Sequence, residues 1–199
     1  MDRKFVLLSI FAGLLIGFGG LAYLNVGGVA GAVLFAFGLL SVVMCRAELY
    51  TGKAGFLPPR QLLRLVVMLL LNVVGCLLAA CVAVYATKES FFTALDAILV
   101  AREAASWHSL IVTSAGTGMI MTLAVYGARQ KHYLPLLFGV PVFILCGLPH
   151  CVADAFYYAV ALLRGDGQWW MLCAWLFAVL GNYVGCNLPR LMQGIESDK

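Results

Sequence analysis

Two hydrophobic segments of this chain are each interrupted by Gly or Pro, close to a polar or ionisable side chain. The first interruption lies in AELYTGKAG (47–55) and contains Thr51, and the second lies in CGLPHCVAD (146–154) and contains His150. Within a bilayer, a break in a helix is tolerated only where it is buried in protein or lines a polar cavity. Broken segments in corresponding halves of a chain are the best sequence indication of a transport site. The pattern therefore favours a channel or transporter for a small solute.

The composition places the chain in a lipid bilayer. Its 199 residues are 63% hydrophobic and 11% charged, with a mean hydropathy of +0.98, values that lie outside the range of soluble proteins. At about 20 residues per span, there is room for about six spans and little else, so we treat residues 1–199 as a single transmembrane domain. The N-terminal apolar run is too long for a signal peptide and lacks a small-residue cleavage site, and we expect it to be the first span.

The cysteines and the net charge indicate no further site. Seven cysteines all lie in apolar stretches without a CxxC pair, which is typical of packing residues rather than of a disulfide or metal framework. The net charge of +4 is spread over the loops and forms no basic patch for nucleic acid. We expect no cofactor and no metal.

We predict an all-α integral membrane protein with six spans, of which the second and the fifth are broken: 5–26, 27–52, 62–87, 107–126, 134–163 and 168–188. The connection TKESFFTALDAILVARE contains an amphipathic stretch that can form a short surface helix. Lysine and arginine gather in the loops on one side, which the positive-inside rule assigns to the cytoplasm: Arg3, Lys4, Arg60, Arg64, Arg129, Lys131, Arg190 and Lys199. We therefore expect a multi-pass protein of the inner (plasma) membrane with both termini in the cytoplasm.

A short motif occurs twice and divides the chain into two halves. NVVGC (72–76) lies in the third span and NYVGC (182–186) in the sixth, each one connection after a broken span. Three spans thus occur twice, at about 5–87 and 107–188. Because an odd number of crossings separates the two copies, they must be inverted in the membrane.

The same residues resemble the formate/nitrite transporters, a family that carries small monovalent anions, over almost the whole chain. LYTG (49–52) is similar to the family's signature in the second span, and GLPHCVADAF (147–156) to its fifth-span histidine motif. GNYVG (181–185) resembles the sixth-span motif, and LAVY (123–126) the end of the fourth span.

The resemblance implies an aquaporin-like fold that assembles as a homopentamer, with one pore in each protomer. It implies a narrow pore in which His150, Thr51, Asn182 and Asn72 form the centre, and in which Arg102 replaces a lysine in the vestibule. It also implies two apolar constrictions: Phe35, Met121 and Phe143 on the outer side, and Leu39, Leu49 and Tyr50 on the inner side.

The chain departs from the family pattern at four positions, where the family has Glu, Asn, Asn and Gly: Pro149, Asp154, Gly118 and Arg46. A lone charge at membrane depth is costly and needs a partner. We therefore predict a buried ion pair between Arg46 and Asp154, with Glu48 as an alternative partner for the arginine and His150 as an alternative partner for the aspartate.

The chemistry of such a pore follows from the bilayer. An anion loses its hydration in an apolar constriction at a cost of several kcal/mol, which a weak acid avoids by crossing in its neutral form. Histidine suits a proton role, since its reference pKa of about 6.5 lies near physiological pH. We expect Arg102 to attract the anion and His150 to supply or stabilise the proton. The expected function is a channel, not an enzyme, for a small anion or its acid, of the formate, nitrite or hydrosulfide class.

Other functions remain open on the sequence. The same architecture fits a channel for a neutral solute such as water, glycerol, ammonia or urea. An intramembrane enzyme or metal carrier would use Cys146, His150, Cys151 and Asp154, although no second ligand cluster completes a metal site. In the simplest structural interpretation, His150 bonds a carbonyl freed by Pro149, Thr51 caps a helix, and the two asparagines hold helices together.

Overall fold

The computed structural model describes residues 2–85 and 88–193, and helices dominate this part of the chain. Within these residues, four helices are long and apolar enough to cross a membrane. They are α1 (Arg3–Val26), α4 (Leu62–Ala83), α6 (Trp107–Arg129) and α9 (Trp169–Gln193). The shorter elements are α2 (Gly28–Met44), α3 (Tyr50–Lys53), η1 (Pro59–Gln61), α5 (Glu89–Ala104), α7 (Leu134–Leu145) and α8 (Cys151–Arg164).

Each predicted span coincides with one helix or with two helices in succession. The predicted break near 47–52 separates α2 from α3, and the predicted break near 147–150 separates α7 from α8. The helices and the two interruptions therefore lie where the sequence predicts them, while the crossing of the membrane by all six segments stays a prediction. Lys199 and the last two residues of the predicted span 62–87 lie outside the described residues.

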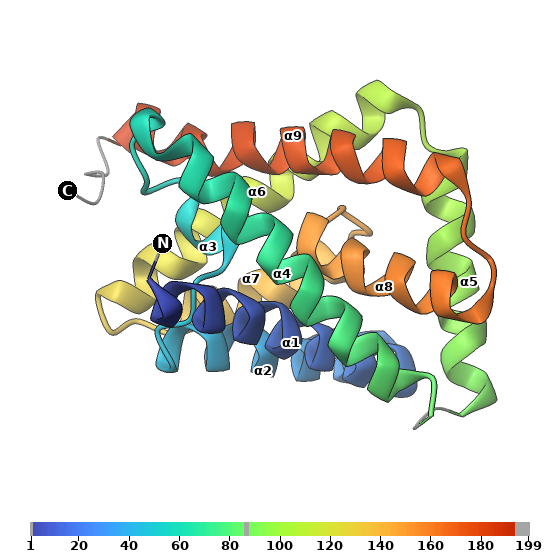
Figure 1. Cartoon of the computed structure of the whole chain (residues 1–199). Coiled ribbons are helices and arrows are strands. Elements are labelled where there is room, and N and C mark those ends of the chain that lie inside the picture. The colour runs from blue at the N-terminus through green and yellow to red at the C-terminus, as the bar shows by residue number, and fades with distance from the viewer. Residues whose placement is uncertain (1, 86–87, 194–199) are drawn as a thin grey trace.

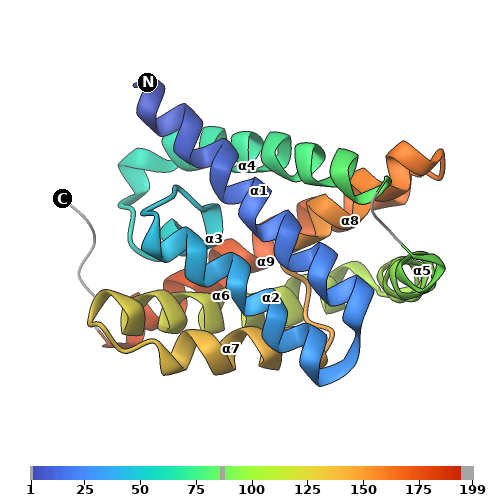
Figure 2. The same ribbon diagram turned by 90° about the horizontal axis from the view of Figure 1, so that it is seen from below.

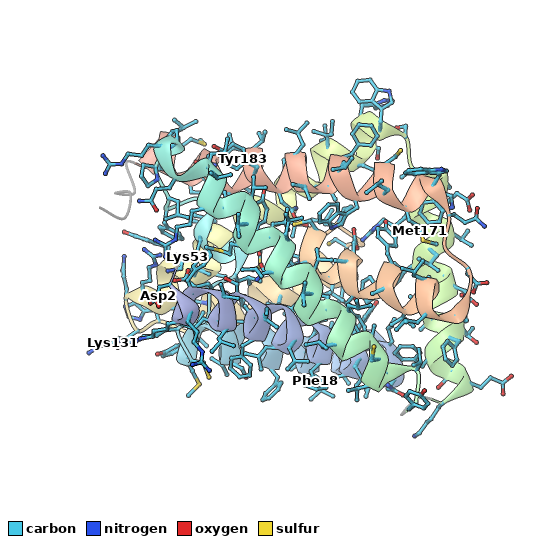
Figure 3. The ribbon with its side chains drawn as sticks, viewed as in Figure 1. Asp2, Phe18, Lys53, Lys131, Met171 and Tyr183 are labelled. Atoms are coloured by element: carbon cyan, nitrogen blue, oxygen red, sulfur yellow. The ribbon has the colours of Figure 1, made fainter. Side chains whose placement is uncertain are left out.

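The long helices lie alongside one another, and α5 crosses one end of the bundle (Figure 1). α1 packs against α2 and α4, while α6 packs against α7 and α9. The first group meets the second where α2 contacts α7, and α8, which follows α7 in the chain, contacts α4. Figure 2 shows this arrangement from below. Asp2, Lys53 and Lys131 lie at the end of the bundle away from α5, whereas Met171 lies near α5 (Figure 3).

Glycines allow the long helices to approach closely. A Cβ at Gly75 in α4 would lie 2.0 Å from the carbonyl oxygen of Ile10 in α1, and a Cβ at Gly185 in α9 would lie 1.9 Å from that of Ala115 in α6. Neither distance is possible for a larger residue. These two glycines therefore set how closely α4 packs on α1 and α9 on α6.

Both breaks have the same backbone geometry. After α2, the N–H of Arg46 donates to the carbonyl of Val43, and the φ angle of Arg46 is 52°. After α7, the N–H of Gly147 donates to the carbonyl of Ile144, and the φ angle of Gly147 is 65°. This left-handed conformation suits glycine but costs a residue with a Cβ about 1–2 kcal/mol. The chain then extends to Leu49 or His150 before the next helix begins.

The connection between the two halves forms the amphipathic surface helix expected there. α5 buries Phe91, Leu95 and Leu99, which lie on one face at a spacing of four residues. The α5 residue Asp96 forms an ion pair with Arg164 at the end of α8. These contacts fix α5 across the end of the bundle.

Candidate functional site

An asparagine from a long helix holds the first backbone N–H of each half-helix. Asn72 Oδ1 in α4 accepts from the N–H of Tyr50, the first residue of α3, at 2.9 Å. Asn182 Oδ1 in α9 accepts from the N–H of Cys151, the first residue of α8, at 2.8 Å. The free N–H groups at a helix start need such partners when no water can reach them.

The same two asparagines tie each break to the first long helix of its half. Asn72 Nδ2 donates to the carbonyls of Ser9 and Glu48, at 2.7 and 2.9 Å. Asn182 Nδ2 donates to the carbonyls of Ser114 and Pro149, at 2.8 and 3.1 Å. Asn182 therefore bonds the backbone on both sides of His150 rather than the histidine ring.

His150 joins the two half-helices through its side chain. Its Nε2 lies 2.8 Å from Thr51 Oγ1, and its Nδ1 accepts from the N–H of Ala153 at 3.1 Å. Because Nδ1 must be unprotonated to accept, the ring hydrogen is on Nε2 and is donated to the hydroxyl oxygen of Thr51. Both side chains are buried. The arrangement therefore holds a neutral imidazole, and the threonine hydroxyl hydrogen is available to another acceptor.

Aromatic rings cover the histidine on one side. The Phe143 ring stacks on the His150 ring with centroids 5.4 Å apart, and the Phe35 ring meets Phe143 edge-on at 6.1 Å. The hydroxyl of Tyr50 donates to the carbonyl of Val179 in α9. The other residues expected at the constrictions are buried in the same core: Leu39, Leu49 and Met121.

A cavity of about 360 Å³ reaches the histidine from the side of α5. We call it the α5 vestibule. Its lining combines residues of α1, α5, α7 and α8, among them Tyr23, Arg102, Phe143, Asp154 and Tyr157, and it includes His150. Arg102, expected in a vestibule, does line this cavity.

Arg102 forms an ion pair with Asp154 in the α5 vestibule. Arg102 Nε lies 3.2 Å from Asp154 Oδ2, Nη2 donates to Oδ1 at 3.3 Å, and Nη1 donates to the carbonyl of Gly147 at 2.9 Å. The Asp154 side chain is 1% exposed and the Arg102 side chain 11%. Two opposite charges in this geometry compensate each other and fix the glycine turn at the second break.

The predicted ion pair between Arg46 and Asp154 is wrong. The two breaks meet at Thr51 and His150, but the charges lie on opposite sides of that contact. Arg46 is exposed and lines a second cavity, whereas Asp154, one turn into α8, faces α5. The alternative partners are not used either, because within the described residues Glu48 pairs with Lys53 and Arg64, each at 3.6 Å, and Asp154 pairs with Arg102.

The second cavity, of about 350 Å³, opens at the end of the bundle away from α5. We call it the α3 vestibule. Leu49 and Gly52 line it beside three cationic side chains: Arg46, Lys53 and Arg129. Three cationic side chains thus gather at this end of the bundle, and one of them, Lys53, pairs with Glu48.

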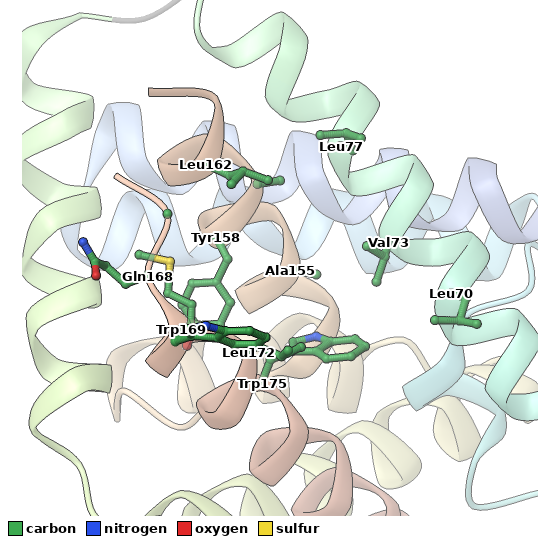
Figure 4. Close-up of a pocket in the computed structure, with 13 residues that line it drawn as sticks. Leu70, Val73, Leu77, Ala155, Tyr158, Leu162, Gln168, Trp169, Leu172 and Trp175 are labelled. Carbon is green, nitrogen blue, oxygen red and sulfur yellow. The ribbon is translucent and has the colours of Figure 1, made fainter. Parts of the chain in front are cut away.

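A larger cavity lies away from the histidine, between α4, α8 and α9. It measures about 620 Å³ and is lined mainly by apolar and aromatic side chains, including Tyr158, Trp169 and Trp175 (Figure 4). Because its lining does not include His150, Thr51 or the two phenylalanines, this cavity is separate from the contact between the two breaks. Within the described residues, no group of three or more His, Cys, Asp or Glu side chains could hold a metal ion.

Two buried cysteines contribute hydrogen bonds that the sequence did not reveal. Cys76 Sγ donates to the carbonyl of Val152 in α8 at 3.2 Å, and Cys186 Sγ donates to that of Thr51 in α3 at 3.5 Å. Each cysteine thus contacts the half-helix of the opposite half of the chain. Their common place, four residues after the asparagine in the repeated motif, was the only available signal.

The comparisons with known proteins agree with this architecture. The family model described as formate/nitrite transporter matches residues 2–189. A solved structure described as an FNT family ion channel is 19% identical, has a TM-score of 0.82, and matches over 93% of this chain and 86% of its own. A pentameric formate channel with formate bound is 18% identical, has a TM-score of 0.82, and matches over 96% and 95%. No curated protein matches. On the family match, this chain belongs to the formate/nitrite transporter family.

Proposed function

We infer that the chain is a membrane channel for a small monovalent anion or its weak acid, of the formate, nitrite or hydrosulfide class. The observation that carries this inference is the bond between Thr51 and His150, which joins two helix breaks between two cavities. Such a polar contact at the meeting point of broken helices is the arrangement expected of a transport site. One of the similar structures is a formate channel with formate bound.

The proposed fold has six spans in two inverted repeats, with α2–α3 and α7–α8 as the broken spans. The hydrogen bonds of Asn72 and Asn182 support this repeat because they match position by position. Tyr50 corresponds to Cys151, Glu48 to Pro149, and Ser9 to Ser114. Two halves that are built alike would place equivalent residues around one pore centre.

We further propose a homopentamer in the plasma membrane, with one pore per protomer and both termini in the cytoplasm. The pentameric relative supports the assembly. The lysine and arginine side chains that gather at the α3 vestibule, at the end where α1 begins, support the orientation. In this orientation α5 lies on the outside. The 620 Å³ groove of Figure 4 would then face lipid or a neighbouring protomer.

In the proposed path, the solute passes Phe35 and Phe143, then the contact of Thr51 with His150, and then Leu49. The apolar rings exclude hydrated ions because hydration is lost there. The neutral His150 ring accepts from the N–H of Ala153 and donates to the Thr51 hydroxyl oxygen, so the Thr51 hydroxyl hydrogen can be donated to the passing solute. The N-terminal end of α8 adds a positive dipole at the same point.

The test is a flux panel in proteoliposomes that contain the purified protein. Formate, nitrite, hydrosulfide, lactate and glycerol are each offered at two pH values, with empty liposomes as the control. The proposal predicts flux of the small acids that depends on pH, with little flux of glycerol. Flux of glycerol or urea that matches or exceeds flux of the acids would instead identify a channel for neutral solutes.

A further inference from the structure

The two half-helices differ in length, although the breaks before them are alike. α8 has 14 residues, whereas α3 has four. The last four carbonyls of an α-helix have no partner within that helix, so a helix of one turn leaves its carbonyls to other donors. Thr51, Ala54 and Phe56 are buried, and a buried carbonyl without a partner costs free energy. Residues 51–57, which we call the α3 segment, therefore need hydrogen-bond donors from elsewhere in the protein.

The backbone of the α3 segment leaves three carbonyls without an N–H partner. The last bond of α3 runs from the N–H of Ala54 to the carbonyl of Tyr50, and the N–H groups that donate next both donate to Lys53. Within the described residues, no backbone N–H donates to the carbonyls of Thr51, Ala54 and Leu57. These carbonyls lie three residues apart in the chain.

Side chains of α9 donate to all three carbonyls, in the same order along both segments. We call these side chains the α9 donors. The bonds, at 3.5, 3.3 and 3.2 Å, join Cys186 Sγ to Thr51, Asn187 Nδ2 to Ala54 and Arg190 Nη1 to Leu57.

Packing also fixes the α3 segment. A Cβ at Gly55 would lie 2.3 Å from the carbonyl oxygen of Cys186 and 2.6 Å from Thr122 Oγ1, so glycine is needed for this approach to α9. The guanidinium carbon of Arg129 in α6 lies 3.7 Å from the centroid of the Phe56 ring, a cation–π contact. α6 and α9 together therefore hold the α3 segment.

The matching positions of α4 lack two of the three donors. Counted from the asparagine of the repeated motif, Asn187 corresponds to Leu77 and Arg190 to Ala80. The half-helix of the other half, α8, is long enough to pair most of its own carbonyls. The additional donors of α9 thus occur in the half that has the short half-helix.

The α3 segment carries part of the site described above. It begins at Thr51, whose hydroxyl oxygen lies 2.8 Å from His150 Nε2, and its residues Gly52 and Lys53 line the α3 vestibule. Because the Cys186 thiol bonds the Thr51 carbonyl, a change in this bond would move Thr51 relative to the histidine.

We propose that the α9 donors Cys186, Asn187 and Arg190 are positioning residues of the pore. They hold the α3 segment as a fixed wall of the α3 vestibule, and they set the place of the Thr51 hydroxyl against His150. This proposal rests on the proposed channel function.

The first test measures backbone hydrogen exchange of residues 54–57 in the protein reconstituted in nanodiscs. Asn187→Ala with Arg190→Met removes two of the three donors, and exchange of these amides becomes about ten-fold faster or more, as expected for the loss of two hydrogen bonds.

Asn25→Ala is the matched control for this test. Asn25 donates to the carbonyl of Leu21, four residues earlier, just as Asn187 donates to that of Tyr183, but within the described residues it bonds no other segment. Exchange of residues 54–57 in this variant equals that of the wild type. Wild-type exchange in the double variant would overturn the proposal that the α9 donors hold the α3 segment.

The second test measures formate flux in proteoliposomes, counted per assembled protein. Cys186→Ala lowers the maximum flux by about five-fold or more and changes the half-saturating concentration by less than about two-fold, since the bond acts on passage at Thr51 rather than on capture in a vestibule. Cys186→Ser keeps a donor and returns the maximum flux to within about two-fold of wild type.

Cys76→Ala controls for the loss of a buried thiol, because Cys76 and Cys186 are both fully buried. Cys76 donates to Gly13 and Val152, whose carbonyls lie inside α1 and α8 and keep helical partners. Its maximum flux therefore stays within about two-fold of wild type. Equal losses in the two alanine variants, or no recovery in Cys186→Ser, would overturn the positioning role. A wild-type protein that carries no small acid would refute the proposed function instead, and the exchange measurement would still decide whether the α9 donors hold the α3 segment.

Discussion

Replacing Asn182 with alanine removes three buried hydrogen bonds at once. Its side chain holds the N–H of Cys151 and the carbonyls of Ser114 and Pro149, and it is fully buried. Side-chain hydrogen bonds in membrane proteins average about 0.6 kcal/mol each, and a buried N–H left without a partner adds about 1–3 kcal/mol. We expect a loss of about 2–4 kcal/mol in the free energy of unfolding.

The assay is equilibrium unfolding in mixed detergent micelles, followed by tryptophan fluorescence, with Asn72→Ala measured beside Asn182→Ala. Asn72 makes the matching contacts with Tyr50, Ser9 and Glu48, so it should cost a similar amount. The half-helices that the two asparagines cap meet at one contact, so the losses in the double variant should not add. A loss below about 0.5 kcal/mol in either single variant would refute the reasoning.

Three further predictions concern the constriction, the strained turn and the ion pair. Phe35→Ala with Phe143→Ala should raise lactate flux relative to formate flux in proteoliposomes, while Phe138→Ala, exposed on α7, should leave the ratio unchanged; an unchanged ratio in the double variant would place these rings outside the path. Arg46→Gly should stabilise the protein by about 0.5–1 kcal/mol in the unfolding assay by relieving the positive φ, and a loss of stability would contradict this. Arg102→Met alone should lower the free energy of unfolding by about 3–5 kcal/mol, because it leaves a buried carboxylate without a partner, and adding Asp154→Asn should recover much of that loss. If the losses of the two single variants simply add in the double variant, Arg102 and Asp154 do not stabilise the protein as a pair.

The helices could be predicted from the sequence because the bilayer restricts what an apolar chain can do. Long apolar runs fixed α1, α4, α6 and α9, and the Gly and Pro residues beside polar groups located both breaks. Each of these inferences depends on local sequence alone, which is why they hold.

The partner of Asp154 could not be predicted in this way. It lies in α5, outside both repeats, and the position of that helix over the cavity depends on the packing of Phe91, Leu95 and Leu99. The prediction paired the charged side chains of the two breaks with each other, so it could not identify a partner in the connection between the two repeats. The hydrogen bonds from α9 to residues 51–57 were hidden for the same reason, since they are set by tertiary packing.

The central claim is that the solute passes the buried His150, and one flux measurement tests it most directly. Formate flux is measured in proteoliposomes for the wild-type protein, for His150→Ala, and for His108→Ala as the control, since His108 is exposed near the start of α6. The account predicts that His150→Ala changes flux by about ten-fold or more, equivalent to about 1.4 kcal/mol, and alters its pH dependence, while the assembled protein persists and His108→Ala behaves as wild type. Full flux with the wild-type pH dependence in a folded His150→Ala protein would contradict the account.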